Sequence, residues 1–196
     1  MSDNSPDTPT VLVVDDESDV ADLYAYRLED AFSVRTAYSG EEAIETVDET
    51  VDVILLDRRM PGMTGDEVLA SVRESHHECR VIMVTAIDPD IEIVDMPFDD
   101  YLCKPVGQDT LIEAVEHQLT ARQYSETMQE LFSATSKVGV LEAEKTAEEL
   151  EASEEYQGLK DEIEELRGQQ EELIDELDDF EAAFNAIDRA PESESA

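Results

Sequence analysis

Three aspartates follow two short apolar runs of this chain. Asp15 and Asp16 come directly after the run at 10–14 (TVLVV), and Asp57 follows the run at 51–56 (VDVILL). In a parallel sheet the carboxyl ends of such strands share one edge, so we expect the three carboxylates to converge there. Three close negative charges repel one another unless a divalent cation lies between them, and an all-oxygen site suits Mg²⁺. With the metal offsetting charge, Asp57 can act as the nucleophile toward a phosphoryl group.

Two further side chains fit the same chemistry. Thr85 ends the apolar run at 80–84 (RVIMV), and Lys104 follows a weaker run at 98–102 (FDDYL). We expect the Thr85 hydroxyl to donate a hydrogen bond to a phosphoryl oxygen and the Lys104 ammonium to supply the counter-charge. Pro105 restricts Lys104 to an extended or turn backbone and admits a cis bond between the two residues.

These residues need a sheet to position them. The β-branched apolar runs at 10–14, 51–56 and 80–84 are typical of strands buried on both faces, and weaker strands fit at 33–37 and 98–102. Helical patterns fill the gaps, so right-handed crossovers and a five-stranded doubly wound α/β sheet are predicted. In such sheets the functional crevice lies beyond the carboxyl ends of the strands.

The helices have recognisable starts. Ser39 or Gly40 can cap the second helix, and Thr64 opens the third. Between Thr85 and Lys104 the chain is short, and Asp88 followed by Pro89 is a good cap and first-turn pair. We therefore expect a short or irregular fourth helix. The fifth begins near 107–110 and presents an apolar face to the sheet, formed by Leu111, Ala114, Val115, Gln118 and Leu119.

Beyond residue 120 the composition becomes Glu-rich and helical. A heptad of apolar residues with one polar member, Gln170, predicts a coiled coil or helix-packing stripe; its members are Leu159, Ile163, Leu166, Gln170, Leu173, Leu177, Phe180, Phe184 and Ile187. An earlier, less regular stripe is interrupted at 133–136 and consists of Tyr124, Met128, Leu131 and Val138. Because a glycine inside a helix costs about 1 kcal/mol relative to alanine, a turn near 133–139, which ends at Gly139, is the expected break. An intramolecular helical hairpin, a homodimeric coiled coil and a docking face for a downstream protein partner all remain open.

The blocks VLVVDDE, LLDRRMPGMTG, MVTA and DDYLCKP, taken together, resemble the receiver domain of two-component response regulators over residues 9–120. The resemblance implies a flavodoxin-like fold and phosphoryl transfer from a sensor histidine kinase to Asp57. It implies Mg²⁺ held by Asp16, Asp57 and the backbone carbonyl of Arg59, with Asp15 supporting the metal site.

The same resemblance implies that Thr85 and Tyr101 form a switch pair, the hydroxyl moving toward the phosphoryl group while the ring turns inward. Tyr101 also has a plainer interpretation as a core residue. The sequence departs from the family pattern between Ala86 and Pro97, the segment on which the family builds the fourth helix with its usual output and dimerisation surface.

Residues 121–188 are similar to the HalX domain of haloarchaeal regulators, on the segments SKVGVLEAEK and EYQGLKDEIEEL. Residues 1–8 and 189–196 are expected to be disordered.

A formal charge of −39, with 26 of the 52 acidic residues in 1–106 and 26 in 107–196, indicates adaptation to a salty cytoplasm, since such self-repulsion needs screening. The sequence shows no basic n-region at its start and no apolar stretch long enough for a membrane span, so a soluble cytoplasmic protein is expected.

We expect a signalling switch that controls transcription through protein partners. Direct DNA binding is the alternative, but no basic recognition helix occurs, and the net acidity of 107–196 opposes it. A phosphorylation-independent interaction scaffold is a further alternative. A metabolic enzyme of the haloacid-dehalogenase type is disfavoured because Arg59 stands where a second aspartate is needed. The only chemistry expected is self-phosphorylation and dephosphorylation at Asp57.

Overall fold

The computed structural model describes residues 8–86 and 91–184. It divides into two compact units between Leu119 and Thr120. The disorder expected at 1–7 and 189–196, the cap pair Asp88–Pro89 and the heptad position Ile187 lie outside the described residues, as do the side chains at the heptad positions 180 and 184.

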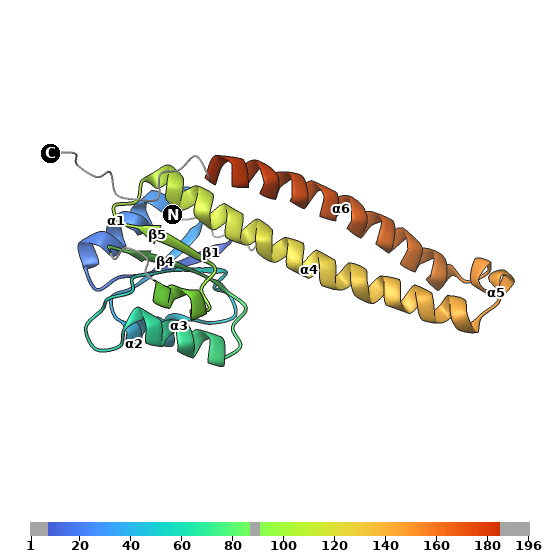
Figure 1. Ribbon diagram of the computed structural model, residues 1–196, viewed down its shortest axis with the longest axis horizontal. Coiled ribbons are helices and arrows are strands. Elements are labelled where there is room, and N and C mark those ends of the chain that lie inside the picture. Colours follow the sequence, from blue (N-terminus) through green and yellow to red (C-terminus); the bar gives the residue numbers. More distant parts are fainter. Residues whose placement is uncertain (1–7, 87–90, 185–196) are drawn as a thin grey trace. The chain divides into compact units, whose positions relative to one another are not determined.

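The first unit is built on a five-stranded parallel sheet (Figure 1). Its strands lie in the order β2-β1-β3-β4-β5, which is the flavodoxin-like order. The strand bounds are β1 Thr10–Val14, β2 Ser33–Ala37, β3 Val53–Leu56, β4 Arg80–Thr85 and β5 Asp100–Cys103. Every strand pair is parallel, so all carboxyl ends meet at one edge. The predicted doubly wound fold is confirmed.

Helices cover both faces of this sheet. Figure 1 shows α1 (Ser18–Leu28) and the beginning of α4 (Gln108–Glu144) on one face and α2 (Gly40–Thr46) and α3 (Gly65–Glu74) on the other. Alternate strand residues supply the two cores: Val11 and Leu55 pack with the first pair of helices, and Leu12 and Ile54 with the second. Because both faces are buried, the central strands β1, β3 and β4 are apolar except at their ends, where Thr10, Arg80 and Thr85 lie.

The predicted helix starts are present. Ser39 accepts a hydrogen bond from the Glu42 backbone N–H at 3.1 Å and caps α2. Thr64 and Glu67 form a reciprocal capping box at the start of α3. The fourth helical segment is a single 3₁₀ stretch, η1 (Ile91–Asp95), which confirms the expected short helix.

Asp99 fastens the segment between η1 and β5. Its carboxylate accepts from Arg73 Nη2 at 2.6 Å, from Arg80 Nη1 at 2.7 Å and from the Val81 backbone N–H at 2.7 Å. Arg73 also donates to the Pro97 carbonyl at 2.9 Å. Charge-assisted bonds to one carboxylate thus join α3, β4 and the start of β5.

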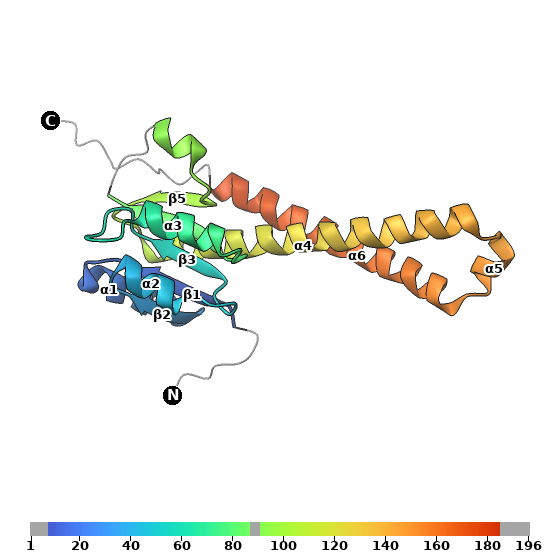
Figure 2. The ribbon, with the colours of Figure 1, turned by 90° about the horizontal axis from the view of Figure 1, so that it is seen from below.

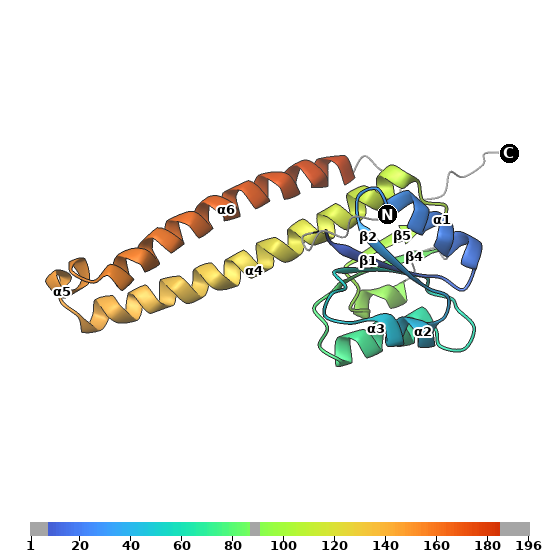
Figure 3. The same ribbon diagram turned by 180° about the vertical axis from the view of Figure 1, so that it is seen from behind.

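The second unit, Thr120–Phe184, is a helical hairpin. The part of α4 after Leu119 lies alongside α6 (Glu154–Phe184), and the short helix α5 (Ala147–Glu151) makes the turn (Figures 1, 2 and 3). Three of the predicted heptad positions on α6 are buried: Ile163, Leu166 and Leu173. The facing stripe of α4 buries small residues, Thr127 and Ala134, which the sequence analysis did not include.

The predicted break near 133–139 is wrong. Helix α4 continues through Gly139 to Glu144, and the turn begins at Lys145 and Thr146. Thr146 forms a capping box with Glu149, whose carboxylate accepts from the Thr146 backbone N–H at 3.0 Å. A glycine inside a helix lowers helix stability by only about 1 kcal/mol relative to alanine, which is too little to end the helix. A capping box, by contrast, gives hydrogen-bond acceptors to two backbone N–H groups that have no partner within the helix. The capping pair, rather than the glycine, therefore determines where the hairpin turns.

Candidate functional site

Four polar residues meet at the carboxyl edge of the sheet. Asp15 follows β1, Asp57 follows β3, Thr85 is the last residue of β4, and Lys104 follows β5. The exposed fractions are 3% for Asp15, 7% for Asp57 and 1% for Thr85. Backbone pairing of neighbouring strands, including Asp57 N–H to the Val14 carbonyl at 2.8 Å, brings these strand ends together.

Lys104 joins two of the carboxylates directly. Its Nζ donates to Asp15 Oδ2 at 2.5 Å and to Asp57 Oδ1 at 2.7 Å. The Lys104 backbone N–H also bonds the Thr85 carbonyl at 2.8 Å, and the Lys104–Pro105 bond is cis, as its sequence admits. One ammonium thus offsets two buried negative charges.

The pKa values reflect this environment. Burial raises the pKa of Asp57 above its ordinary value, although hydrogen bonds from Lys104 and from the Arg59 backbone N–H oppose the rise. Burial lowers the pKa of Lys104, but its bonds to Asp15 and Asp57 outweigh burial, so the net shift is upward. Lys104 is therefore held as an ammonium beside a carboxylate that binds protons more readily than usual.

Backbone N–H groups hold the remaining carboxylate oxygens. Asp15 Oδ1 accepts from the Glu17 N–H at 3.0 Å, and Asp57 Oδ2 accepts from the Arg59 N–H at 2.7 Å. Both bonds close tight turns directly after a strand. The orientation of each carboxylate is thus set by the chain that follows it.

The predicted cluster of three carboxylates does not form as expected. Asp16 has an exposed side chain, while Asp15 and Asp57 share Lys104. Among the described residues, no group of three or more acidic, histidine or cysteine side chains is placed to hold a metal ion. The Lys104 ammonium offsets the repulsion between Asp15 and Asp57, a role that the sequence pattern assigned to a divalent cation.

The donor set nevertheless fits Mg²⁺. This ion prefers oxygen ligands, keeps several waters and is usually held by only one or two carboxylates. Asp57 and Asp15 lie at this edge, and the residues that follow them in the chain offer further oxygens: the exposed Asp16 a carboxylate and Arg59 a backbone carbonyl. A three-carboxylate cage is therefore not required.

Tyr101 lies within β5 and is half-buried against the core on the α2 and α3 face. Its ring lies 5.7 Å from that of Phe98, centroid to centroid. Arg58, the residue after Asp57, contacts the Tyr101 side chain by a hydrogen bond and bonds Asp66 at 3.1 Å. The neighbour of Asp57 in sequence thus touches the proposed switch residue.

Sequence reasoning missed two residues that shape the site. A Cβ on Gly65 would lie 2.2 Å from the Asp57 carbonyl oxygen, so only glycine allows the start of α3 to approach this closely. Arg27 Nη1 donates to the Val106 carbonyl at 2.6 Å and so fastens the turn after Lys104 to α1. A glycine directly after the Thr64 cap was a readable signal for the first, while no local pattern identifies the second.

No helix in the described part of the chain is long and apolar enough to cross a membrane.

Family comparisons identify both units. A family model for the response regulator receiver domain matches residues 11–116, and a model for the HalX domain matches residues 120–186. A Haloferax volcanii protein, described as a candidate transcriptional regulator, is 43% identical over 188 residues, which covers 92% of this chain and 32% of that protein. The chain therefore spans about a third of that relative's length.

Solved structures match the first unit. The signal receiver domain of a candidate Luxo repressor from Vibrio parahaemolyticus has a TM-score of 0.57 and 26% identity, covering 61% of this chain and 95% of that one. A Francisella response regulator receiver has a TM-score of 0.51 and 33% identity, covering 56% and 95%. The BeF3-activated receiver of DrrB, a Thermotoga maritima protein, has a TM-score of 0.53 and 25% identity, covering 57% and 97%.

Proposed function

The chain belongs to the response regulator receiver family and carries a HalX domain after its receiver domain, and from this premise we propose that it accepts a phosphoryl group on Asp57 from a sensor histidine kinase. The observation that carries the proposal is the bond of 2.7 Å between Lys104 Nζ and a buried Asp57 at the carboxyl edge of the sheet. A metabolic hydrolase is a poorer fit, because the position two residues after Asp57 is arginine.

The transfer step uses Asp57 as the nucleophile. Its Oδ attacks the phosphorus of the donor phosphohistidine, the new O–P bond forms as the P–N bond breaks, and the imidazole leaves with the electron pair. When bound, Mg²⁺ supplies positive charge for the phosphoryl oxygens; Asp16, Asp57 and the Arg59 carbonyl would hold it, supported by Asp15. Lys104 would exchange its bond to Asp57 for one to a phosphoryl oxygen while keeping Asp15.

Phosphorylation would then shift an equilibrium between two conformations. The Thr85 hydroxyl donates to the phosphoryl group, and the Tyr101 ring fills the space that Thr85 leaves. Support comes from the placement of Thr85 at the strand end and of Tyr101, half-buried, on the neighbouring strand. The similarity to a receiver activated by BeF3 is consistent with the same kind of switch.

The output would pass through the HalX domain to a downstream protein partner in transcriptional control. The relative described as a candidate transcriptional regulator supports that role. Direct contact with DNA is disfavoured because the chain has 13 basic against 52 acidic residues and would repel phosphate groups. We place this action in the cytoplasm, where a histidine kinase presents its phosphoryl group.

Intact mass after incubation with Mg²⁺ and acetyl phosphate in molar KCl tests the proposal. Wild type should gain the mass of one phosphoryl group, and Asp57→Asn should gain none. The Asp52→Asn variant is the matched control, because Asp52 precedes the same strand and accepts a backbone bond from Thr10 at 2.8 Å. A folded, Mg²⁺-binding wild type that gains no mass would rule out the phosphoacceptor role.

A further inference from the structure

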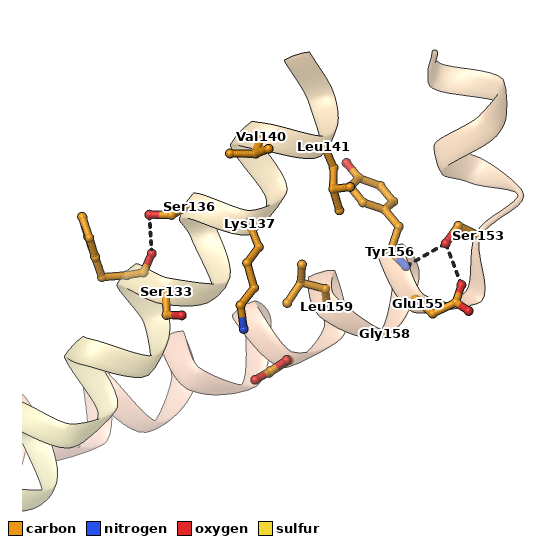
Figure 4. Close-up of a pocket in the computed structure, with 12 residues that line it drawn as sticks. Ser133, Ser136, Lys137, Val140, Leu141, Ser153, Glu155, Tyr156, Gly158 and Leu159 are labelled. Carbon is orange, nitrogen blue, oxygen red and sulfur yellow. Dashed lines mark hydrogen bonds between the residues drawn. The ribbon is translucent and has the colours of Figure 1, made fainter. Parts of the chain in front are cut away.

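The HalX hairpin leaves an open groove between its helices near α5. The groove has a volume of about 1030 Å³ and is lined by side chains of α4 between Phe132 and Leu141, by Ser153 before α6, and by side chains of α6 between Glu155 and Glu162. Figure 4 shows Lys137 reaching from α4 toward α6, with Leu159 pointing back from α6. The groove is open and its lining is mostly apolar, so apolar side chains of both helices lack packing partners on that side.

Two large apolar side chains border the groove on α4. Phe132 is 77% exposed and Val140 is 65% exposed, and both line the groove. Ser136 lies four residues from each of them, so the three side chains form a row along one side of α4. The floor nearby is made of small residues, Ser133 and Ser136 on α4 and Gly158 on α6, and a Cβ at Gly158 would meet nothing within 4 Å. The surface thus has two projecting apolar side chains beside a recess formed by small residues.

The hairpin alone has a thin core. Its buried residues include small ones on α4, Thr127 and Ala134, and larger ones on α6, Ile163, Leu166 and Leu173. Two helices joined by a short turn bury one stripe each, whereas bundles of four bury two faces. Small units that lack a sufficient core are commonly stabilised by oligomerisation.

The groove walls carry opposite charges. Lys137 lies on the α4 wall, and Glu155 and Glu162 lie on the α6 wall. Two copies facing each other about a two-fold axis parallel to the helices would place α4 of each copy over α6 of the other. Each Lys137, which reaches toward α6 of its own chain (Figure 4), would then also face the acidic wall of the other copy, so the surface is complementary to itself.

We propose that the occupant of this groove is a second copy of the chain, so that two HalX hairpins pair groove to groove as a four-helix bundle. Phe132 and Val140 of each copy fill the groove of the other. A second copy is favoured because it would bring Lys137 opposite the Glu155 and Glu162 wall, which a helix without a basic residue at that position could not do. Pairing does not require phosphorylation, so it can fail or hold independently of the proposed phosphoacceptor role.

Sedimentation of the full chain over a micromolar to millimolar concentration series in molar KCl tests the pairing. Wild type should form dimers, and Phe132→Ser and Val140→Ser should each weaken dimerisation about tenfold to hundredfold, as expected for a central interface anchor. Tyr26→Ser is the matched control, because Tyr26 on α1 is an aromatic of similar exposure, 70%, and should leave dimerisation unchanged. A monomeric wild type, or a dimer that Phe132→Ser does not weaken, would overturn the proposal, as would an equal loss in the control.

Charge reversal tests the two-fold arrangement. Lys137→Glu and Glu162→Lys should each dimerise more weakly alone, because like charges then face each other, and an equimolar mixture should recover dimers of mixed composition. Because about 1 M salt reduces the Debye length to about 3 Å, the mixture is measured at the lowest KCl concentration that preserves the circular dichroism of both variants. A mixture no stronger than its components would contradict the proposed axis.

Discussion

The receiver domain and the HalX domain distribute their apolar residues in contrasting ways. In the receiver, the strand residues Leu12, Ile54 and Ile82 are wholly buried between layers of helices. In the HalX hairpin, Phe132 and Val140 are largely exposed beside an open groove. The dense sheet can hold a lysine between two carboxylates within hydrogen-bond distance, which a loosely packed hairpin could not. The packing of the receiver suits the chemistry proposed for it, and that of the hairpin suits the proposed association.

Replacing Lys104 by methionine is expected to have the largest effect. Removing one partner from a buried charge network typically costs about 3–5 kcal/mol, because Asp15 and Asp57 would remain buried without an ammonium. Urea unfolding of the full chain in divalent-free buffer at neutral pH measures the loss of unfolding free energy. In the same buffer, Arg35→Met should change the receiver little, because Arg35 pairs with Asp48 on the exposed surface.

The pH dependence of this variant has a defined sign. Burial already raises the pKa of Asp57, and Lys104 opposes that rise, so removing Lys104 should raise the pKa further. A buried carboxylate with a raised pKa destabilises the folded state when ionised and ceases to do so once protonated. The deficit of Lys104→Met relative to wild type should therefore shrink as pH falls through the folded-state pKa of Asp57. A deficit that grows on acidification would show that the charge argument is wrong.

Alanine substitutions in the two cores compare the packing directly. Leu55→Ala in β3 should cost about 2–5 kcal/mol, because Leu55 is 1% exposed and the surrounding sheet cannot collapse into the cavity. Leu173→Ala in α6 should fall at or below the low end of that range, since the hairpin can move to fill the space. Urea unfolding followed by circular dichroism checks both. Equal losses of unfolding free energy in the two variants would show that the receiver and the hairpin are packed equally tightly.

Much of the receiver was predictable because its signals are local. Apolar β-branched runs indicated the strands, Ser39 and Thr64 indicated helix starts, and the short segment before Lys104 indicated the reduced fourth helix. The same spacing indicated that Asp15, Asp57 and Lys104 would lie together at one edge, whereas their chemical roles are proposals. The Lys104 bridge between the two carboxylates depends on atomic distances, so sequence reasoning assigned the offsetting charge to a metal instead.

The hairpin was less predictable because its signals are weaker. Thr127 and Ala134 occupy buried positions of α4 but are too small or polar to mark an apolar stripe. The glycine at 139 suggested a break, yet the capping pair Thr146 and Glu149 determined it. Arg27 reaches Val106 across the fold, and no local pattern encodes that contact.

Replacing the hairpin cap should have a moderate effect confined to the HalX domain. Thr146→Ala removes the side chain that accepts from the Glu149 N–H at 3.3 Å and should cost about 1 kcal/mol. Thr146→Ser keeps the hydroxyl and serves as the matched control, with a loss of only a few tenths of a kcal/mol at most. Hydrogen exchange on α5 should accelerate in the alanine variant alone. Acceleration spread equally over the receiver would contradict a local cap.

The smallest expected effect is a gain in stability. Gly139 lies inside α4 with nothing within 4 Å of an added Cβ, so Gly139→Ala should stabilise the hairpin by up to about 1 kcal/mol through helix propensity alone. Gly168→Ala in α6 is the matched control, since an added Cβ there is equally unobstructed and the gain should be similar. Thermal unfolding followed by circular dichroism measures both. If Gly139→Ala destabilised the protein while Gly168→Ala stabilised it, α4 would have to bend at Gly139. Glycine, and not only the Thr146 and Glu149 cap, would then help to determine the shape of the hairpin.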